Sequence, residues 1–303
     1  MIEQAYHVPV MLNECIEGLE INPEGTYVDV TFGGGGHSKA ILEKLTTGKL
    51  FGFDQDQDAK ANALKINNNA FTLIEANFRY LKKYLRLHGI EKVDGVLADL
   101  GISSHQINTP ERGFSTRFDA ELDMRMNQMG SINAKNIINE YSEHDLHKIF
   151  GMYGEIKNAK SLAQQVVRAR ASTPISTVFE LKDAVKTLVK KGEENKYYAQ
   201  MFQALRIEVN DELKTLEEML MGTAEVIRPG GLLVVMSYHS LEDRLVKNFI
   251  QKGKFHGEVE KDFYGNEIKP FEAVNRKLIE ASEAEVAMNN RARSAKLRIA
   301  RKL

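Results

Sequence analysis

Four consecutive glycines, Gly33 to Gly36, stand between an apolar, β-branched run that begins at Val28 and a helix-like segment. Each glycine costs roughly 0.5–1 kcal/mol relative to alanine in regular structure, so a cluster indicates a tight turn or the close approach of another group. Open α/β sheets bind ligands at the carboxyl ends of their strands, where glycines let a ligand approach the backbone. The glycines therefore predict a ligand-binding loop, with a flexible loop as the alternative.

A carboxylate on the next strand narrows the choice of ligand. Asp54 ends the run LFGFD, where it can accept both hydroxyls of an adenosine ribose. The loop departs from the dinucleotide pattern G-x-G-x-x-G, because Ser38 and Lys39 stand where the third glycine is needed. Asp29, four residues before the first glycine, can instead hold a cationic amino-acid moiety. These residues favour S-adenosylmethionine over a dinucleotide.

Asp99 closes a further β-rich run, in the segment VDGVLADLGISS. Amino-group methyltransferases carry a D/N/S-P-P-Y sequence at this place, and here the two prolines and the aromatic residue are replaced. Asp99 is a candidate catalytic carboxylate, and Ser103 is a candidate polar partner beside it. The alternative for Asp99 is a helix cap or a turn former.

The elements that must position these groups alternate along the first hundred residues. The β-rich runs are 27–30, 49–53, 71–74 and 93–98, and the helix-like segments between them include 38–45 and 59–66. This alternation predicts βαβ units and a parallel sheet. A further buried strand is expected at 232–238, with a helix at 240–250 after it.

A helical stretch interrupts this pattern. Residues 141–192 carry three helical patterns, and two of them begin with capping signals at Ser142 and Thr177. Apolar residues at spacings of three and four predict one further long helix over 202–220. The last segment, 294–302, alternates apolar and charged residues, which suits a strand with one solvated face.

The whole chain therefore predicts an α/β protein with an inserted helical domain. The sheet is expected to be Rossmann-like and mostly parallel, with helices on both faces. Residues 1–104 and 206–303 form the sheet domain in this prediction, and residues 105–205 form the insertion.

Composition excludes collagen-like, disordered and membrane proteins. Of the 303 residues, 43% are hydrophobic and 27% charged, which is typical of globular proteins. The 41 Lys and Arg oppose 42 Asp and Glu, so a polyanion site needs local clustering of cations. The lone Cys15 allows neither an intramolecular disulfide nor a cysteine zinc cluster, and no metal site is expected. Because no signal peptide and no apolar run of ~20 residues is present, we expect a cytoplasmic protein without a membrane partner.

Nine ordered blocks resemble one family, the bacterial methyltransferases that modify N4 of a cytidine in small-subunit (16S) ribosomal RNA near the decoding centre. The blocks span nearly the whole chain and are HVPVMLNE (7–14), VDVTFGGGGHS (28–38), ADLGISSHQ (98–106), ERGFS (111–115), LDMRM (122–126), YGE (153–155), FQALRIEVNDEL (202–213), SYHSLEDR (237–244) and NRARSAKLR (290–298). The resemblance implies a class I methyltransferase fold, S-adenosylmethionine as methyl donor, and small-subunit ribosomal RNA or the small subunit as acceptor.

The resemblance also implies residue roles. The candidate cofactor-binding residues are Gly33, Gly35, Gly36, His37, Asp54, Phe78, Asp99 and Gln106. Two positions depart from the family pattern: Gln200 replaces an arginine, and His105 replaces a proline. These departures concern the acceptor side of the site.

Cytosine N4 is a poor nucleophile, because its lone pair is delocalised into the ring. A group that accepts an N4 proton would help to localise this lone pair, and Asp99 and Ser103 are the candidates. A cytosine inside a duplex cannot present N4, so an unpaired or flipped base is expected. The candidate RNA-binding residues are Ser104, Arg112, Phe114, Arg125, Arg291 and Arg293. The arginine-rich tail has a solvated face as its alternative.

Three other functions compete with this interpretation. A non-catalytic RNA-binding or assembly factor is disfavoured by the intact glycine loop, Asp29 and Asp54. A nucleotide-dependent oxidoreductase is disfavoured by Ser38. Only the family resemblance distinguishes a methyltransferase of RNA from one that acts on protein or DNA. The sequence leaves open whether the chain forms a homodimer.

Overall fold

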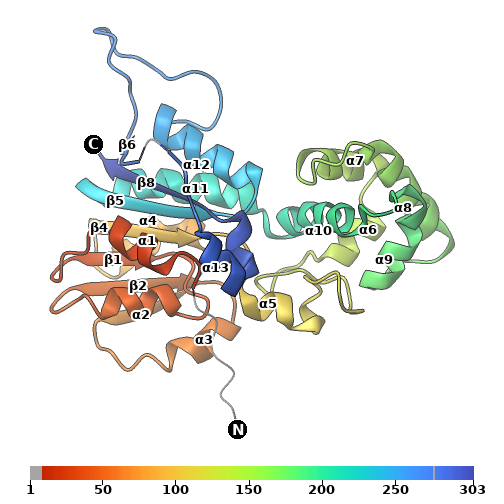
Figure 1. The fold of residues 1–303 in the computed structure, drawn as a ribbon, viewed down its shortest axis with the longest axis horizontal. Coiled ribbons are helices and arrows are strands. Elements are labelled where there is room, and N and C mark those ends of the chain that lie inside the picture. The colour runs from red at the N-terminus through yellow and green to blue at the C-terminus, as the bar shows by residue number, and fades with distance from the viewer. Residues whose placement is uncertain (1–8, 276) are drawn as a thin grey trace. The chain divides into compact units, whose positions relative to one another are not determined.

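The computed structural model describes residues 9–275 and 277–303, and the chain folds into two compact units (Figure 1). Unit 1 extends to Gly101 and resumes at Leu213, whereas unit 2 is the continuous segment Ile102–Glu212. The borders expected from the sequence, 104/105 and 205/206, fall a few residues inside unit 2. Each unit has its own hydrophobic core.

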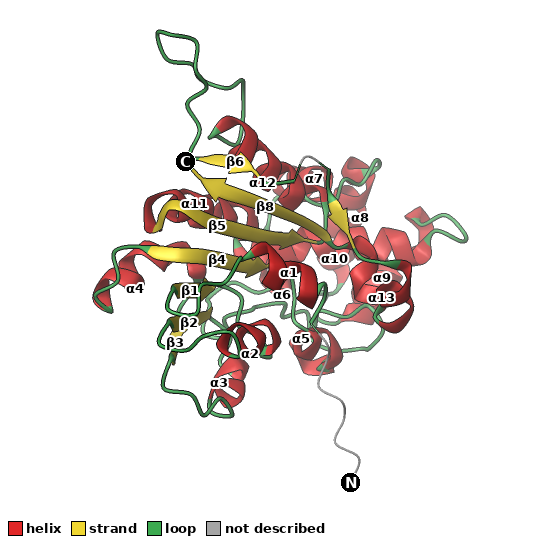
Figure 2. Cartoon of the chain, turned by 60° about the vertical axis from the view of Figure 1, so that its left-hand side comes forward, coloured by secondary structure: helices red, strands yellow, loops and turns green. Residues whose placement is uncertain are grey.

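Unit 1 is built on a mostly parallel sheet with helices on both faces (Figure 2), which confirms the predicted fold class. The strands are β1 (Thr26–Asp29), β2 (Lys49–Asp54), β3 (Phe71–Glu75), β4 (Val93–Asp99), β5 (Ile227–Ser237), β6 (Phe271–Ala273), β7 (Ile279–Glu280) and β8 (Lys296–Lys302). Their order is β3-β2-β1-β4-β5-β8-β6, and β7 also pairs with β8. The first five strands pair in parallel, whereas β8 is antiparallel to its neighbours.

Two layers of helices cover this sheet. The helices of unit 1 are α1 (Leu12–Gly18), α2 (Gly36–Leu42), α3 (Asp58–Ala63), α4 (Leu81–Leu87), α11 (Glu212–Val226), α12 (Ser240–Lys252) and α13 (Glu283–Met288), with 3-10 helices η1 (Phe78–Tyr80) and η4 (Asn290–Ser294). Successive strand residues face opposite sides of a sheet. On β4, Val96 and Ala98 pack with α4, α11 and α12, while Leu97 packs with α1 and α2. Burial on both faces explains the continuous apolar runs of the central strands.

Unit 2 is helical. Its helices are α5 (Ser104–Asn108), α6 (Ala134–Glu140), α7 (Glu143–Met152), α8 (Ala159–Ser172), α9 (Val178–Val185) and α10 (Glu194–Asn210), with 3-10 helices η2 (Pro110–Arg112) and η3 (Lys186–Leu188). The predicted caps are confirmed: Ser142 accepts a hydrogen bond from the backbone N–H of Asp145, and Thr177 forms a capping box with Glu180. Apolar residues of α6 to α10 share one core cluster.

Two expectations about individual elements are wrong. The helix expected over 202–220 is two helices, because Asp211 adopts a left-handed φ of 49° and separates α10 from α11. The face of β8 that was expected to be solvated is covered by α12: Arg298 is paired with Asp243 of that helix, and Ala300 is buried. The terminal strand is therefore part of the sheet core.

Candidate active site

Three aspartates end adjacent strands at one edge of the sheet in unit 1. Asp54 ends β2, Asp29 ends β1 and Asp99 ends β4, and these strands are neighbours in the order β2-β1-β4. The chain runs from β1 to β2 and β3 on one side before it crosses to β4 on the other, so a topological switch point lies between β1 and β4. Ligands of open α/β sheets bind at the carboxyl ends of the strands at such a point.

The glycine loop between β1 and α2 packs closely against the chain itself. Gly33 and Gly35 adopt left-handed φ angles of 49° and 76°, which other residues rarely adopt. A Cβ on Gly36 would overlap the ring of Pro9, and one on Gly35 would lie 2.9 Å from the ring of Phe32. Beside Gly33 the nearest atom to such a Cβ is 3.8 Å away, so this side of the loop is open.

Asp54 contacts the glycine loop at the backbone N–H of Gly33. Its Oδ2 accepts a hydrogen bond from the Gly33 backbone N–H at 2.8 Å, and its Oδ1 accepts one from the Asp56 backbone N–H at 2.8 Å. Burial raises the pKa of Asp54 to about 6, although these two hydrogen bonds oppose the shift. Each carboxylate oxygen has a second lone pair, so Asp54 can accept further hydrogen bonds from a ligand.

Asp99 is held by groups from three other elements. Its Oδ1 accepts a hydrogen bond from the Tyr238 hydroxyl at 2.7 Å, and its backbone N–H donates to Thr31 Oγ1 at 2.7 Å. His37 Nδ1 lies 3.9 Å from Asp99 Oδ2. Burial raises the pKa of Asp99 to about 6, against the opposing effects of His37 and Tyr238. The helix-cap alternative for Asp99 is wrong, because Ser103 caps the helix that follows.

His37 presents one ring nitrogen to Asp99 and the other to the backbone. Its Nε2 lies 3.1 Å from the Val10 carbonyl oxygen. A carbonyl only accepts hydrogen bonds, so Nε2 is the donor in this contact. Nδ1 is the ring nitrogen nearer to the Asp99 carboxylate.

Asp29 lies behind this surface and is only 1% exposed. Its Oδ2 accepts a hydrogen bond from the Ser38 hydroxyl at 2.7 Å, and its Oδ1 accepts one from the Thr31 backbone N–H at 3.1 Å. Burial raises its pKa. The expected direct contact of Asp29 with a cationic amino-acid moiety is therefore wrong. The carboxylate instead orients Thr31, which in turn holds the backbone of Asp99.

Tyr238 is the residue of this site that the sequence analysis missed. It directly follows β5, the strand beside β4, and its hydroxyl contacts Asp99. Burial and the neighbouring Asp99 raise its pKa well above the ordinary value, so the hydroxyl keeps its proton and donates. A signal was available, because Tyr238 lies in the block SYHSLEDR at the end of an expected buried strand.

Comparisons with known proteins agree with this geometry. The model of the MraW methylase family matches residues 4–303. A protein of Cytophaga hutchinsonii named ribosomal RNA small subunit methyltransferase H is 61% identical over 97% of this chain and 99% of that protein. A protein of Christiangramia forsetii with the same name is 58% identical over 100% of both chains. The chain belongs to the MraW methylase family.

As an MraW methylase, the chain is a methyltransferase that uses S-adenosylmethionine, which confirms the cofactor expected from its sequence. Among solved structures, an rRNA methylase from Streptococcus thermophilus is similar with a TM-score of 0.43 and 14% identity, over 100% of this chain and 99% of that one. Within the described residues, no helix combines the length and the apolar character needed to cross a bilayer.

The carboxyl edge of the MraW methylase sheet fits this cofactor. The open side of Gly33 lets a ligand approach the backbone, and Asp54 beside it has acceptor capacity for two ribose hydroxyls. His37 and Asp99 continue the same edge toward β4. The candidate cofactor residues that unit 1 brings together here are Gly33, Gly35, Gly36, His37, Asp54 and Asp99.

The remaining candidate residues lie elsewhere in the chain. Phe78 begins η1 after β3 and packs against the core of unit 1. Arg291 and Arg293 belong to η4, where Arg293 is exposed. The other candidates belong to unit 2 and are Ser103, Ser104, Gln106, Arg112, Phe114 and Arg125.

Several of the candidates in unit 2 have partners within that unit. Ser103 and Gln106 form the capping box of α5. The buried Arg112 guanidinium donates to the carbonyl of Arg125 at 2.9 Å. Arg125 binds the Asp123 carboxylate through two hydrogen bonds of 2.8 and 2.7 Å. Burial alone would raise the pKa of Asp123, but the Arg125 hydrogen bonds hold it below its usual value.

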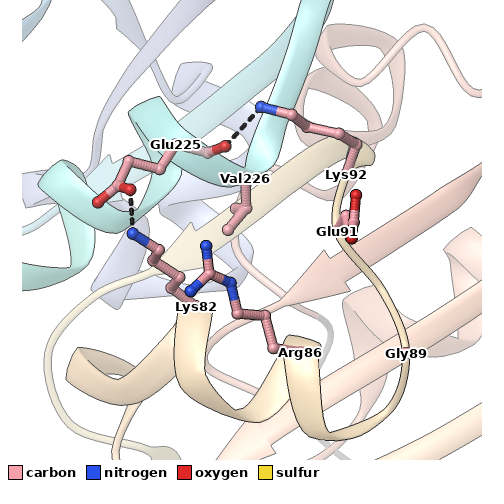
Figure 3. A pocket seen from close by; sticks show the side chains of 7 residues that line it. All are labelled: Lys82, Arg86, Gly89, Glu91, Lys92, Glu225 and Val226. Carbon is pink, nitrogen blue, oxygen red and sulfur yellow. Dashed lines mark hydrogen bonds and ion pairs between the residues drawn. The ribbon is translucent and has the colours of Figure 1, made fainter.

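A hollow of about 680 Å³ in unit 1 lies apart from these carboxylates (Figure 3). Its lining comes from α4, from the loop before β4 and from the end of α11, so it lies at the amino end of β4. Lys82 forms an ion pair with the Glu225 carboxylate, and Lys92 Nζ donates to the Glu225 carbonyl at 2.7 Å. These lysines lie at the C-terminal end of α11, where the helix dipole favours positive charge.

Proposed function

We propose that this MraW methylase transfers a methyl group from S-adenosylmethionine to the exocyclic N4 of a cytidine in small-subunit (16S) ribosomal RNA near the decoding centre. The observation that carries the proposal is the carboxyl edge of the sheet, where a glycine loop and buried aspartates lie together. The 61% identity to a ribosomal RNA small subunit methyltransferase H supports the substrate class. The sequence blocks of the cytidine-N4 family support the base and the atom.

The glycine loop and Asp54 hold the cofactor in this proposal. The backbone of Gly33, Gly35 and Gly36 forms one wall of the site, and Asp54 accepts hydrogen bonds from the ribose hydroxyls. Bound S-adenosylmethionine supplies an electrophilic methyl group on a positively charged sulfur. Phe78 and Gln106 are the further proposed cofactor contacts.

Asp99 accepts the N4 proton in this proposal. A hydrogen bond from N4 to a carboxylate localises the nitrogen lone pair and raises its nucleophilicity. Tyr238 occupies Oδ1, so Oδ2, on the side of His37, is the oxygen available to the base. As the nitrogen–carbon bond forms and the sulfur–carbon bond breaks, N4 releases one proton, which Oδ2 takes up. Ser103 is the proposed second polar contact.

A pKa of about 6 suits Asp99 to this task. The carboxylate is ionised at neutral pH, yet it binds a proton more strongly than an ordinary aspartate does. A base with a pKa near the working pH transfers protons most effectively. Burial, the main cause of the raised pKa, thus supports the proposed chemistry.

Unit 2 is the proposed substrate-recognition domain and corresponds to the insertion expected at 105–205. The proposed RNA contacts are Ser104, Arg125, Arg291 and Arg293, whereas Arg112 and Phe114 are buried within unit 2. The proposed acceptor is the ribosomal RNA or the small ribosomal subunit in the cytoplasm, and a homodimer is an alternative to a monomer.

Methyl transfer from labelled S-adenosylmethionine tests the proposal. The acceptors are protein-free small-subunit ribosomal RNA and isolated small subunits that lack the modification. The expected product is N4-methylcytidine in a nucleoside mass analysis. Label on another base, on another atom of cytidine or on protein would overturn the proposed substrate. No transfer to either acceptor would overturn the proposed reaction.

A further inference from the structure

Glu242 is a buried carboxylate behind Tyr238 in unit 1. It lies in the first turn of α12, and only 3% of the residue is exposed. A buried ionisable group is costly unless hydrogen bonds satisfy it. The contacts of Glu242 therefore show what its burial serves.

One role of Glu242 is to begin α12. Glu242 and His239 form a capping box, in which Glu242 Oε2 accepts a hydrogen bond from the His239 backbone N–H and His239 Nδ1 accepts one from the Glu242 backbone N–H. Both distances are 3.4 Å, which is long for a hydrogen bond. The helix cap is thus the weaker part of the contacts that Glu242 makes.

The shorter hydrogen bond of Glu242 goes to Tyr238, one residue before the cap. The Tyr238 backbone N–H donates to Glu242 Oε2 at 2.9 Å. A capping box satisfies the cap residue itself, so helix capping does not account for this bond. Strand β5 ends at Ser237, and the Glu242 carboxylate provides the acceptor that a neighbouring strand provides within the sheet.

Two hydrogen bonds in series therefore connect Glu242 to Asp99. The Glu242 carboxylate holds the backbone of Tyr238, and the Tyr238 hydroxyl donates to Asp99 Oδ1 at 2.7 Å. The hydroxyl lies at the far end of a long side chain, so a small rotation of the Tyr238 backbone displaces it from Asp99. A misplacement of about 1 Å away from the reacting atoms can cost on the order of 10²-fold in rate.

We propose that Glu242 is a positioning residue for methyl transfer, which fixes Tyr238 so that its hydroxyl occupies Asp99 Oδ1 and leaves Oδ2 to the acceptor base. This inference rests on the proposed function, because that function makes Asp99 the proton acceptor. Glu242 acts through the Tyr238 hydroxyl, so its effect on the reaction disappears when that hydroxyl is removed.

The variants Glu242→Gln and Glu242→Met form a matched pair. Both side chains are uncharged and similar in length, but only the amide oxygen of glutamine is a good acceptor for the Tyr238 N–H. Their comparison separates the hydrogen bond from the loss of charge. His239 is the titratable group that faces Glu242 on α12. Both variants retain it, together with the other titratable groups that interact with Asp99, which are Cys15, Asp29, His37 and Tyr238.

A double-mutant cycle with Tyr238→Phe is the kinetic test. With the Tyr238 hydroxyl present, we expect kcat of Glu242→Met to be about tenfold lower than that of Glu242→Gln, with similar KM values. In the Tyr238→Phe background the two Glu242 variants should have equal kcat. Equal kcat with the hydroxyl present, or a tenfold difference that persists without it, would overturn the proposal.

Glu242→Asp repeats the kinetic test without loss of charge. Its carboxylate is one carbon shorter, so it withdraws the acceptor from the Tyr238 N–H while an acidic residue remains at this position of α12. We expect kcat to fall about tenfold relative to the wild type, and to be unchanged by the same substitution in the Tyr238→Phe background. All assays are run well below the unfolding midpoint of each variant. A Glu242→Asp variant with wild-type kcat would leave Glu242 with the helix cap alone.

The titration of the Asp99 carboxyl carbon, followed by 13C NMR, gives a result that needs no acceptor RNA. The signal is assigned by its loss in Asp99→Asn. Because the Tyr238 hydrogen bond lowers the pKa of Asp99, that pKa should be higher in Glu242→Met than in Glu242→Gln. Equal midpoints would contradict the positioning role. If the wild type transfers no methyl group to cytidine N4, the proposed function itself fails, whereas an active wild type with equal midpoints overturns only the role of Glu242.

Discussion

Partly buried carboxylates in the two units of this chain differ in the sign of their pKa shifts. At the sheet edge of unit 1, burial raises the pKa of Asp54 and Asp99 to about 6, and within the described residues neither has a Lys or Arg partner. In unit 2, Arg125 holds the pKa of Asp123 below its usual value despite burial. The first region keeps acceptor capacity for ligands, whereas the second satisfies its charges within the fold. Carboxylates with a raised pKa and no Lys or Arg partner indicate functional sites.

The largest expected effect is that of Asp99→Asn on catalysis. The amide cannot take up the N4 proton, so kcat should fall by about 10²–10⁴-fold. The affinity for S-adenosylmethionine should change much less, because the ribose site is intact. Single-turnover methyl transfer and calorimetry measure the two quantities. An unchanged kcat would remove Asp99 from the mechanism and erase the functional difference between the two regions.

Asp54→Asn should act on cofactor binding. Losing charge-assisted hydrogen bonds to the ribose costs about 1.5–3 kcal/mol, so the Kd for S-adenosylmethionine should rise roughly 10–100-fold. Asp123→Asn is the matched control, because it removes a carboxylate that Arg125 already neutralises. Calorimetry well below the unfolding temperature compares the three proteins. Equal Kd values for the two variants would contradict the assignment of Asp54.

Tyr238→Phe should shift the pH dependence of kcat. In the wild type, activity should fall as the pH falls through about 6, because Asp99 must be ionised. The Tyr238 hydrogen bond lowers the pKa of Asp99, so its loss raises that pKa and moves the acid limb of the profile to higher pH. We expect about a tenfold loss of kcat near pH 7. An acid limb at the wild-type position would reduce Tyr238 to a packing role.

The expected effects on stability have opposite signs in the two regions. The folded-state pKa of Asp99 lies above the ordinary value of 3.8, so the folded chain binds the proton more tightly. Between pH 4 and 6 this group therefore lowers the free energy of unfolding as the pH rises, by on the order of 2–3 kcal/mol. Asp99→Asn should stabilise the chain at pH 7.5 and leave it unchanged near pH 4.

Arg125→Gln provides the contrast, because it leaves Asp123 without its partner and should destabilise the chain at pH 7.5 by about 1–3 kcal/mol. Urea denaturation at pH 4 and 7.5 measures both variants. Destabilisation by Asp99→Asn at pH 7.5 would show that its carboxylate is satisfied within the fold, like that of Asp123.

Local sequence signals predicted much of the fold. The strands that end in Asp29, Asp54 and Asp99 are short apolar runs, and the caps at Ser142 and Thr177 depend on residues only three positions apart. Both kinds of signal are properties of neighbouring residues, so one sequence is enough to find them. The carboxyl edge of the sheet was predicted as the binding site because βαβ units place the strands in parallel.

Long-range contacts decided the features that the sequence did not predict. Tyr238 and Asp99 are 139 residues apart, and only the pairing of β4 with β5 brings them together. The burial of Asp29 depends on the packing of Thr31 and Ser38 around it. The break at Asp211 leaves the apolar spacing intact, so periodicity could not reveal it.

The most direct test is a crystal structure of the chain with bound S-adenosylmethionine. We expect the ribose hydroxyls to lie within hydrogen-bond distance of the Asp54 carboxylate, and the methyl group to face the side of Asp99 that carries Oδ2. A cofactor bound away from the glycine loop, for example in the hollow beside Lys82 and Lys92, would contradict the account.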